Sequence, residues 1–356
     1  MNAIRKMTMR GMGINMYENI SIETVVITVT TSCNLSCAHC FNRKNDDIGH
    51  MDYDSIAKII NKFSLYGASE IVISGGEPLL HPDIDKIVLI PLLYPKIKFI
   101  IATNGMLLTD DLIAQMEKVD NLSIQISMDG SNIEIYEKQR GTGSYSEFYR
   151  GFLLLAQSSV RCITSKIAVT KINYRDVENI YKLSVDNGIL PSFQFVSSAG
   201  NAKDNWNYLG LNVAQKIYVI DTIKKMNIQY CKDVPIPMPG SGCEFSEYQE
   251  RKAFVIRADG SVIACLWLYD HPIGNILHDS LPAILKGDAM MRLYEMGHKR
   301  YEKRNMSSLC INCVIRSYCR LGCLGIDLID GDESVHDDCA LRKADVALGL
   351  LSQSKC

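Results

Sequence analysis

The sequence lacks both an apolar run long enough to cross a membrane and a recognisable export signal. No window of its 356 residues reaches the roughly 18 uninterrupted apolar residues of a membrane helix. The first 21 residues carry Arg5, Lys6 and Arg10, but no long apolar stretch and no small-residue cleavage site. We therefore interpret residues 1–22 as an N-terminal arm, and we expect a cytoplasmic protein without a membrane partner.

An excess of positive charge is also missing. Lysine and arginine number 38 against 40 aspartates and glutamates, which gives a formal net charge of −2, and no basic block occurs. Sequence-independent nucleic-acid binding relies on such an excess, so we expect no nucleic-acid partner. The composition, 47% hydrophobic and 22% charged, is that of a globular protein with a large core. The length fits an α/β barrel-like domain followed by a smaller one.

Cysteine, by contrast, is abundant, with 13 residues. Without an export signal, closely spaced cysteines favour metal binding over disulfides. Cys33, Cys37 and Cys40 follow an apolar run with three and then two residues between them. Three thiolates in such a loop can hold three irons of a [4Fe-4S] cube and leave the fourth iron open. A zinc site, normally built from four ligands, would need His39 in a poor position, but zinc and structural thiols remain alternatives.

Six short runs rich in isoleucine and valine alternate with helical periods. The predicted strands are residues 23–30, 70–76, 98–104, 122–129, 165–170 and 192–197. Each run is nearly continuously apolar, which is typical of strands that are covered on both faces. The clearest helical periods are residues 51–67, 109–119 and 172–188.

Six strand–helix repeats imply parallel strands joined by right-handed crossovers. Six are too few for a complete eightfold barrel, so we predict an α/β fold with a partial (β/α)6 TIM-like barrel over residues 23–232. Chemistry in such folds gathers at the carboxyl ends of the strands. The cysteine loop falls there, and so do three further motifs, whose residues are Gly75, Gly76, Glu77, Pro78, Asn104, Ser127 and Asp129. We expect these groups to share one edge of the sheet.

Residues 233–356 are predicted to form a small cysteine-rich domain at the C-terminus. The run VPIPMPGSG (residues 234–242) reads as a linker, and a hairpin should turn at Asp259-Gly260. The remainder shows little periodicity, as in regions that are held together by their ligands more than by a core. Its cysteines at cluster-like spacing are Cys243, Cys265, Cys310, Cys313, Cys319, Cys323 and Cys339.

The three-cysteine loop after the first strand, followed by Gly75-Gly76-Glu77-Pro78 after the second, resembles the radical S-adenosylmethionine superfamily over roughly residues 23–230. The resemblance implies a [4Fe-4S] cluster held by the three cysteines, with S-adenosylmethionine bound at its open iron. Reductive cleavage to a 5′-deoxyadenosyl radical and hydrogen abstraction from the substrate would follow. A flavodoxin- or ferredoxin-type protein would supply the electron.

The resemblance also implies the contacts to S-adenosylmethionine. The turn from Gly75 to Pro78, with Glu77, would lie against its amino group. His39, where the family usually has an aromatic residue, would lie near the adenine. The carboxylate and ribose would be contacted by Asn104, Ser127 and Asp129. Asn104-Gly105 and Asp129-Gly130 are also ordinary turn pairs, and that alternative stays open.

The later cysteines resemble the seven-cysteine SPASM extension of peptide-modifying radical enzymes over about residues 240–340. By this resemblance two auxiliary [4Fe-4S] clusters would form. One would be held by Cys310, Cys313, Cys319 and Cys339, and the other by Cys243, Cys265 and Cys323. The fourth position of the second would be open, or filled by Cys231, water or substrate. A double zinc ribbon is the alternative.

We therefore predict an anaerobic oxidoreductase that modifies a peptide by cross-linking, epimerisation or oxidation, with no further catalytic residue assignable. Only about 22 residues precede the first strand, so peptide recognition would use a separate precursor-binding protein or a direct route. The short segment before the first strand also leaves a second function as an alternative. It is dehydrogenation or epimerisation of a small molecule, such as a sugar, aminocyclitol or tetrapyrrole. A sulfatase maturase is disfavoured, since those enzymes place an aspartate base where Leu266 follows Cys265. A non-catalytic iron–sulfur or zinc protein would not cleave S-adenosylmethionine.

Overall fold

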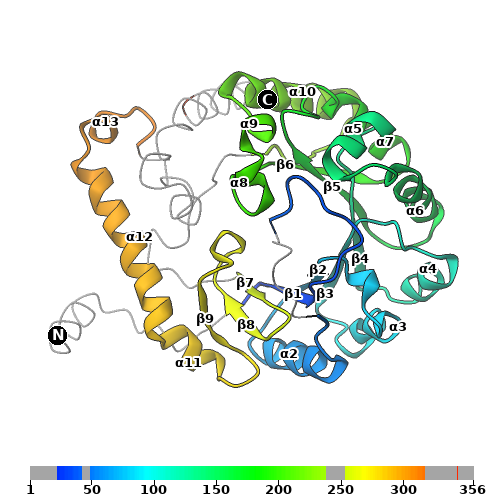
Figure 1. The fold of residues 1–356 in the computed structure, drawn as a ribbon, viewed down its shortest axis with the longest axis horizontal. Coiled ribbons are helices and arrows are strands. Elements are labelled where there is room, and N and C mark those ends of the chain that lie inside the picture. The colour runs from blue at the N-terminus through cyan, green and yellow to red at the C-terminus, as the bar shows by residue number, and fades with distance from the viewer. Residues whose placement is uncertain (1–21, 42–48, 238–252, 317–342, 344–356) are drawn as a thin grey trace.

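A curved sheet of nine strands, with the order β6-β5-β4-β3-β2-β1-β7-β8-β9, organises the molecule (Figure 1). The computed structural model describes residues 22–41, 49–237, 253–316 and 343. The strands are β1 Thr24–Thr30, β2 Glu70–Gly75, β3 Lys98–Thr103, β4 Leu122–Ser127, β5 Ile163–Val169, β6 Leu190–Phe195, β7 Ala253–Ile256, β8 Ser261–Ile263 and β9 Pro272–Asn275. Neighbours from β1 to β6 are all parallel. The predicted partial barrel is confirmed.

Helices from α2 to α7, together with α10, line the outer side of the curved sheet (Figure 1). The helices of the described residues are α2 Tyr53–Leu65, α3 Ile84–Ile87, α4 Asp110–Met116, α5 Ile133–Arg140, α6 Tyr145–Gln157, α7 Val177–Asp186, α8 Asn201–Asp204, α9 Trp206–Leu209, α10 Val213–Tyr230, α11 Leu281–Lys286, α12 Asp288–Met306 and α13 Ser308–Ile311, with 3-10 turns η1 Pro78–Leu80, η2 Ile90–Leu93 and η4 Leu266–Leu268. Helix α2 begins at Asp52, whose side chain accepts a hydrogen bond from Ser55 N at 2.8 Å. Its buried residues are Ile56, Ile59, Ile60 and Phe63.

The strands are not covered on both faces, which corrects the expectation from the sequence. In β5, Ile167 is fully buried, and Ser165 Oγ lies 2.8 Å from Ser184 Oγ of α7. The alternate residues Lys166 and Ala168 are only half-buried and face the concave side. Because the sheet curves away from its helices, its inner face accommodates polar and small side chains that a flat, doubly covered sheet would exclude.

The predicted hairpin at Asp259-Gly260 is confirmed, since β7 and β8 pair antiparallel and Gly260 has a φ of +80°. The sequence did not indicate where this hairpin lies. Strand β7 pairs in parallel with β1, from Thr24 opposite Ala253 to Ile27 opposite Ile256. The first part of the C-terminal region therefore continues the barrel sheet.

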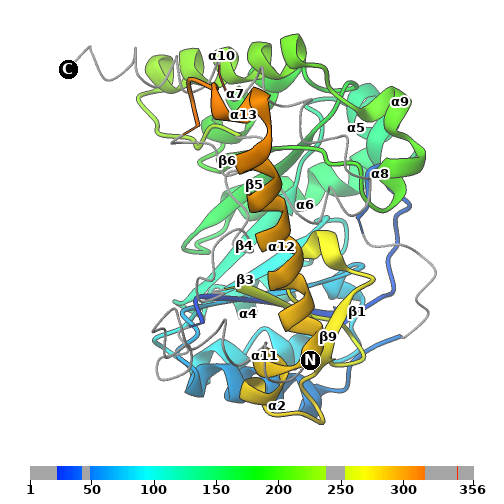
Figure 2. The same cartoon turned by 90° about the vertical axis from the view of Figure 1, so that its left-hand side faces the viewer.

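Helix α12 corrects the expectation of little regular structure near the C-terminus. It is 19 residues long and runs from α11 to α13 across most of the height of the molecule (Figure 2). Among its described side chains, the buried hydrophobic ones are Met290, Leu293 and Tyr294, on a helix whose sequence is otherwise rich in charged residues. So narrow an apolar face gives a weak periodic signal.

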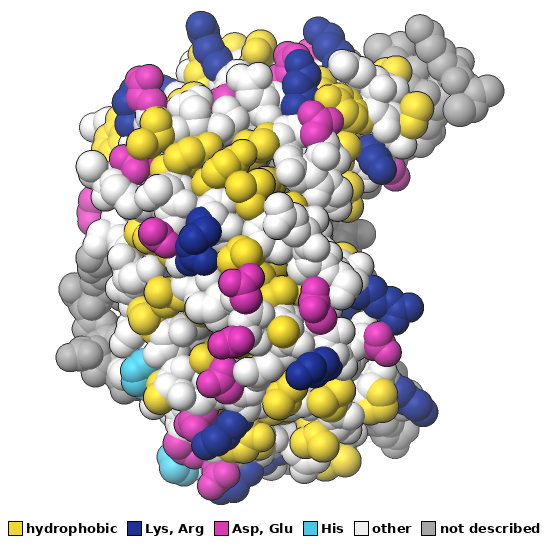
Figure 3. Space-filling model, turned by 90° about the vertical axis from the view of Figure 1, so that its right-hand side faces the viewer, with side chains coloured by type: hydrophobic (Ala, Val, Ile, Leu, Met, Phe, Trp, Pro, Cys, Tyr) yellow, Lys and Arg dark blue, Asp and Glu magenta, His cyan; other side chains and the backbone are white. Residues whose placement is uncertain are grey.

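No helix in the described ranges is both long and apolar enough to cross a membrane. On the face drawn in Figure 3, lysine and arginine side chains are interspersed with aspartate and glutamate. This mixture agrees with the balanced composition of the chain.

Candidate functional site

The cysteine loop begins where β1 ends, and the glycine turn after β2 packs directly against it. Gly76 N donates to Thr30 O, and Glu77 N donates to Ser32 O, both at 2.8 Å. A Cβ on Gly75 would lie 2.4 Å from Thr30 O, and one on Gly76 would lie 2.3 Å from Ser32 O. Both glycines are therefore required for the close approach of two backbones.

A second set of contacts holds the cysteine loop from the opposite side. Asn201 N donates to Cys40 O at 2.8 Å, and Asn201 Nδ2 donates to Cys37 O at 3.2 Å. Asn205 Nδ2 donates to Ala38 O at 3.0 Å. We call Gly200, Asn201 and Asn205 the asparagine clamp. It follows β6, so the last strand of the barrel fixes the loop that follows the first.

The three cysteines of this loop differ in exposure. Cys33 is exposed, whereas Cys37 and Cys40 are half-buried. Leu35 N lies 3.4 Å from Cys33 Sγ, as a donor to the sulfur. Three thiols on one loop, held by backbone contacts on both sides, fit the donor set of a cluster that leaves one iron open.

Glu77 joins the ends of β2 and β3. Its carboxylate is 1% exposed and accepts hydrogen bonds from Thr103 Oγ1 and Asn104 N at 2.7 Å and from Leu79 N at 3.1 Å. Burial raises the pKa of Glu77 above its ordinary value, although these hydrogen bonds act in the opposite direction. The side chain is therefore a fixed part of the turn.

Asn104 ties the end of β3 to the cysteine loop. Its Oδ1 accepts from Met106 N at 3.0 Å, and its Nδ2 donates to Asn34 Oδ1 at 2.8 Å. The sequence correctly placed Asn104 on the same edge as the cysteines. Its contact with the S-adenosylmethionine carboxylate or ribose stays a prediction.

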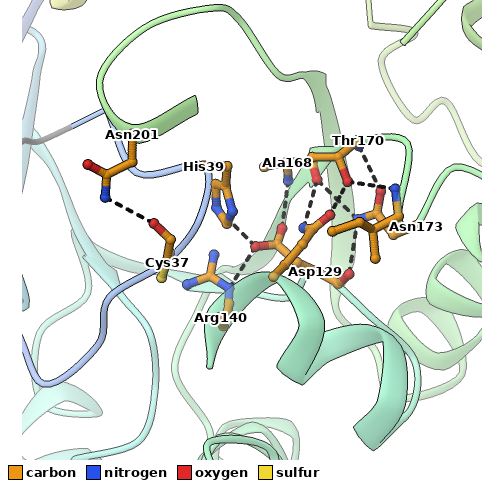
Figure 4. A network of polar contacts seen from close by, with 10 residues as sticks. Cys37, His39, Asp129, Arg140, Ala168, Thr170, Asn173 and Asn201 are labelled. Carbon is orange, nitrogen blue, oxygen red and sulfur yellow. Dashed lines mark hydrogen bonds and ion pairs between the residues drawn. The ribbon is translucent and has the colours of Figure 1, made fainter. Parts of the chain in front are cut away.

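Asp129 is the centre of a polar network at the end of β4 (Figure 4). It is fully buried, and Arg140 Nε and Ala168 N both donate to its carboxylate at 2.7 Å. His39 Nε2 lies 3.2 Å from Asp129 Oδ2. Both carboxylate oxygens thus accept hydrogen bonds from protein groups. In this geometry Asp129 fixes the position of the Arg140 side chain. A direct contact with the ribose or carboxylate stays a prediction.

Arg140, at the end of α5, was missed by the sequence analysis. Its guanidinium is 8% exposed. Burial alone would lower the pKa of Arg140, but the negative charges of the Asp129 carboxylate and of an ionised Cys37 raise it overall. An almost buried cation beside the cysteine loop is complementary to a carboxylate ligand. The sequence signal was weak, because Arg140-Gly141 reads as an ordinary helix end.

His39 presents an unused acceptor in the same network. Burial lowers the pKa of His39 more than Asp129 raises it, and Arg140 lowers it further, so the ring is neutral at neutral pH. If Nε2 carries the proton and donates to Asp129, Nδ1 is an acceptor. Nδ1 is buried and has no hydrogen-bond partner within the described part of the chain. The predicted position of His39 near the adenine would give this acceptor a partner, and that contact stays a prediction.

Ser127 is the last residue of β4, half-buried on the concave side, and its register partner on β5 is Lys166. Pro78 is buried at the start of η1. The predicted contacts of both residues with S-adenosylmethionine stay predictions.

Only part of the second cysteine set can be placed. Cys265 follows β8 and precedes η4, where its carbonyl accepts from Leu268 N at 2.8 Å. Cys313 N donates to Cys310 O at 3.2 Å, so these two cysteines share one turn. The predicted ligands Cys243, Cys319, Cys323 and Cys339 lie outside the described residues. The two auxiliary ligand sets therefore stay predictions.

The structure also places Leu266 and Cys231, two further positions that the sequence analysis discussed. Leu266 begins η4 and packs, partly buried, against the core. Cys231 caps the C-terminal end of α10 in a left-handed conformation, with φ of +48°, and is exposed. Its proposed role as a fourth cluster ligand stays a prediction.

Comparisons with known proteins agree with this geometry. Residues 27–184 match the Radical SAM superfamily, and residues 243–314 match the SPASM iron-sulfur cluster-binding domain. Mycofactocin maturase MftC of Mycobacterium tuberculosis (strain CDC 1551 / Oshkosh) is 23% identical over 315 residues, which cover 85% of this chain and 78% of the maturase. AdoMet-dependent heme synthase of Methanosarcina barkeri is 26% identical over 163 residues, or 45% of this chain and 46% of the synthase.

Solved structures show the same fold. Streptococcus suis SuiB bound to S-adenosylmethionine has a TM-score of 0.71 at 18% identity, with 89% of this chain and 76% of SuiB covered. The anSMEcpe protein with bound AdoMet has a TM-score of 0.67 at 18% identity, with 85% of this chain and 89% of that protein covered.

Proposed function

The chain belongs to the radical S-adenosylmethionine superfamily and carries a C-terminal SPASM domain, and from this premise we propose that it modifies a peptide. The observation that carries the proposal is the convergence of three cysteines, Glu77 and Arg140 at one edge of the barrel. The relative MftC is a maturase, and SuiB has been solved with its precursor peptide SuiA. Both facts support a peptide as the substrate class.

We assign each group of the site a task. Cys33, Cys37 and Cys40 would hold a [4Fe-4S] cluster, which supplies the electron that cleaves S-adenosylmethionine to a 5′-deoxyadenosyl radical. Glu77 holds the glycine turn rigid, so that its backbone can approach the methionine amino group. Arg140 offers a charged donor to the methionine carboxylate. The SPASM domain would add two auxiliary clusters that accept the electron left after hydrogen abstraction.

The cleavage reaction is tested on anaerobically reconstituted protein with dithionite as reductant. Wild-type protein should form 5′-deoxyadenosine, detected by liquid chromatography and mass spectrometry. Replacing Cys33, Cys37 and Cys40 together by alanine should abolish it. Cys162→Ala is the control, since Cys162 is exposed and lies outside the cysteine loop. Product formation by the triple variant would contradict the assignment.

The substrate class needs a separate experiment. Short peptides encoded beside the gene are prepared with deuterium on their carbon atoms, and small metabolites such as sugars are labelled likewise. A peptide-modifying enzyme should transfer deuterium from a peptide into 5′-deoxyadenosine, and the peptide mass should change. Transfer only from a small metabolite would refute the peptide proposal while leaving the radical chemistry intact.

A further inference from the structure

The two short helices α8 and α9 lie beside the cysteine loop at the surface of the molecule (Figure 2). Their inward side repeats every four residues, since Asn201 and Asn205 bind carbonyls of the cysteine loop and Leu209 is buried. Asn205 N donates to Asn201 O, and Leu209 N donates to Asn205 O, as in one helix. Residues four apart therefore share a side, and the residues between them point away from the loop. Among these, Lys203, Trp206 and Tyr208 are exposed.

Two further residues extend this exposed surface. Lys171 follows β5, and its Nζ donates to Asn207 O of α9 at 3.1 Å. Phe41 follows Cys40 and is exposed, and a Cβ on Gly200 would lie 2.6 Å from its Cα. We call the following five residues the α8–α9 face: Phe41, Lys171, Lys203, Trp206 and Tyr208.

The segments that form this face carry an excess of positive charge. Residues 171–175 and 199–218 contain one carboxylate and four cations, which are Asp204, Lys171, Arg175, Lys203 and Lys216. The next carboxylate along the chain, Asp176, is buried and accepts hydrogen bonds from Ser131 N and Oγ. Four cations and one carboxylate give +3, in a chain whose net charge is −2. Such a local excess attracts a negatively charged partner and speeds its association.

The position of the face indicates what this partner does. The barrel side of the cysteine loop has to stay open to S-adenosylmethionine and the substrate, whereas the α8–α9 face points away from the loop. An α-helix is about 10–12 Å across, so a protein that sits on α8 and α9 comes within one helix thickness of the loop. Electron transfer between proteins falls steeply with distance, and this face therefore offers a short route to the cysteines. Exposed aromatic rings such as Trp206 and Tyr208 are enriched in protein–protein contacts.

We propose that the α8–α9 face binds a negatively charged electron-carrier protein, which passes one electron to the cluster on the cysteine loop. This inference rests on the proposed function. In the transfer the carrier is oxidised by one electron and the cluster is reduced by one, and no bond is made or broken. The lysines attract the carrier, and the aromatic rings give it an apolar contact.

The probe is a flavodoxin of strongly negative net charge, photoreduced to its hydroquinone and mixed anaerobically with reconstituted protein. Bleaching of the cluster absorbance in a stopped-flow instrument gives the rate of reduction, and dithionite is the reductant that needs no docking. Flavodoxin should reduce the wild type at a rate that falls as salt rises. Lys171→Glu combined with Lys203→Glu should slow this reaction about tenfold at low salt. Its iron content and its rate with dithionite should stay close to those of the wild type.

The matched control is Lys96→Glu combined with Lys118→Glu. It makes the same change of net charge at two exposed lysines, which lie near the amino ends of β3 and β4, and it should leave the flavodoxin rate close to that of the wild type.

Equal slowing in the two double variants would overturn the proposal, and so would an undiminished flavodoxin rate in the α8–α9 variant. Wild-type protein that is reduced by dithionite but not by flavodoxin would overturn it as well. Loss of dithionite-driven modification of a peptide encoded beside the gene, with an unchanged flavodoxin rate, would assign the face to the substrate. Absence of a reducible cluster from wild-type protein would instead refute the proposed function.

Discussion

At the scale of single residues, the buried pair of Asp129 and Arg140 dominates the site. The two side chains are 0% and 8% exposed and share a hydrogen bond of 2.7 Å. A buried pair of this kind costs desolvation energy. In this one, the Asp129 carboxylate holds the Arg140 guanidinium beside the cysteine loop.

The pair can be tested by a double-mutant cycle. Asp129→Ala leaves a buried, unpaired guanidinium and should lower the free energy of unfolding by about 3–5 kcal/mol. Asp129→Ala combined with Arg140→Met should recover much of this loss, because neither charge remains. Urea denaturation of the single and double variants gives the coupling energy. Additive effects of the two substitutions would show that the pair is not coupled.

Lys166 predicts a pH dependence of stability. Since folding lowers its pKa, the unfolded chain binds more protons, and stability should rise with pH between the lowered value and about 10.4, the pKa of an unperturbed lysine. Lys166→Met should therefore be more stable than wild type at pH 7, and the difference should shrink as the pH approaches 10. Thermal unfolding at a series of pH values checks this. A constant difference across the series would contradict it.

The residues that the sequence could and could not identify differ in how they act. Glu77 and Asn104 follow predicted strands, and parallel strands place their ends on one edge, so their meeting with the cysteines was predictable. Arg140 and Asn201 gave no local signal. Arg140 acts from a helix end through a distant carboxylate, and Asn201 binds backbone carbonyls 161 and 164 residues earlier, at Cys40 and Cys37.

At the scale of elements, the asparagine clamp is the feature that places the cysteine loop. Gly200 has a φ of +57°, and a Cβ there would lie 2.4 Å from Cys40 O. No side chain fits without moving the loop. The predicted strands agreed with the structure within about two residues at each end, because β-branched runs mark strands strongly. Their polar concave face was misjudged, because short runs with serine and lysine still look apolar on average.

Gly200→Ala should reduce cluster assembly on the cysteine loop. Gly143→Ala is the matched control, since Gly143 has a φ of +79° but open space around its Cβ position. Both variants should lose about 1–2 kcal/mol from the left-handed conformation. Only Gly200→Ala should also bind less iron per chain, with a weaker signal of the reduced cluster in electron paramagnetic resonance. Equal iron content in the two variants would show that cluster assembly does not depend on the asparagine clamp.

At the scale of the whole molecule, the barrel and the C-terminal region share one sheet. Phe254, Val255 and Ile256 of β7 are buried beside β1, and Lys62 of α2 donates to Ile276 O at 2.5 Å. The partial barrel was predictable from six strand–helix repeats. The pairing of β7 with β1 was not, because a parallel contact across more than 200 residues has no short-range signature.

A fragment of residues 22–237 should therefore fold poorly on its own. Without β7, strand β1 becomes an edge of the sheet and exposes its apolar neighbours, which favours aggregation. The fragment should be less soluble than full-length protein prepared in parallel, or its unfolding transition should be less cooperative. Sedimentation and circular dichroism check this. A soluble, cooperatively unfolding fragment would show that the barrel is an independent domain.

The asparagine clamp also dictates an order of events during synthesis. Asn201 leaves the ribosome 164 residues after Cys37, which takes about 10–30 s at ordinary translation rates. Throughout that interval the nascent chain carries three thiols without the segment that will hold their loop. Iron delivery to a fixed loop thus waits until the asparagine clamp has been made, and oxygen that reaches the growing chain before then can oxidise these sulfurs.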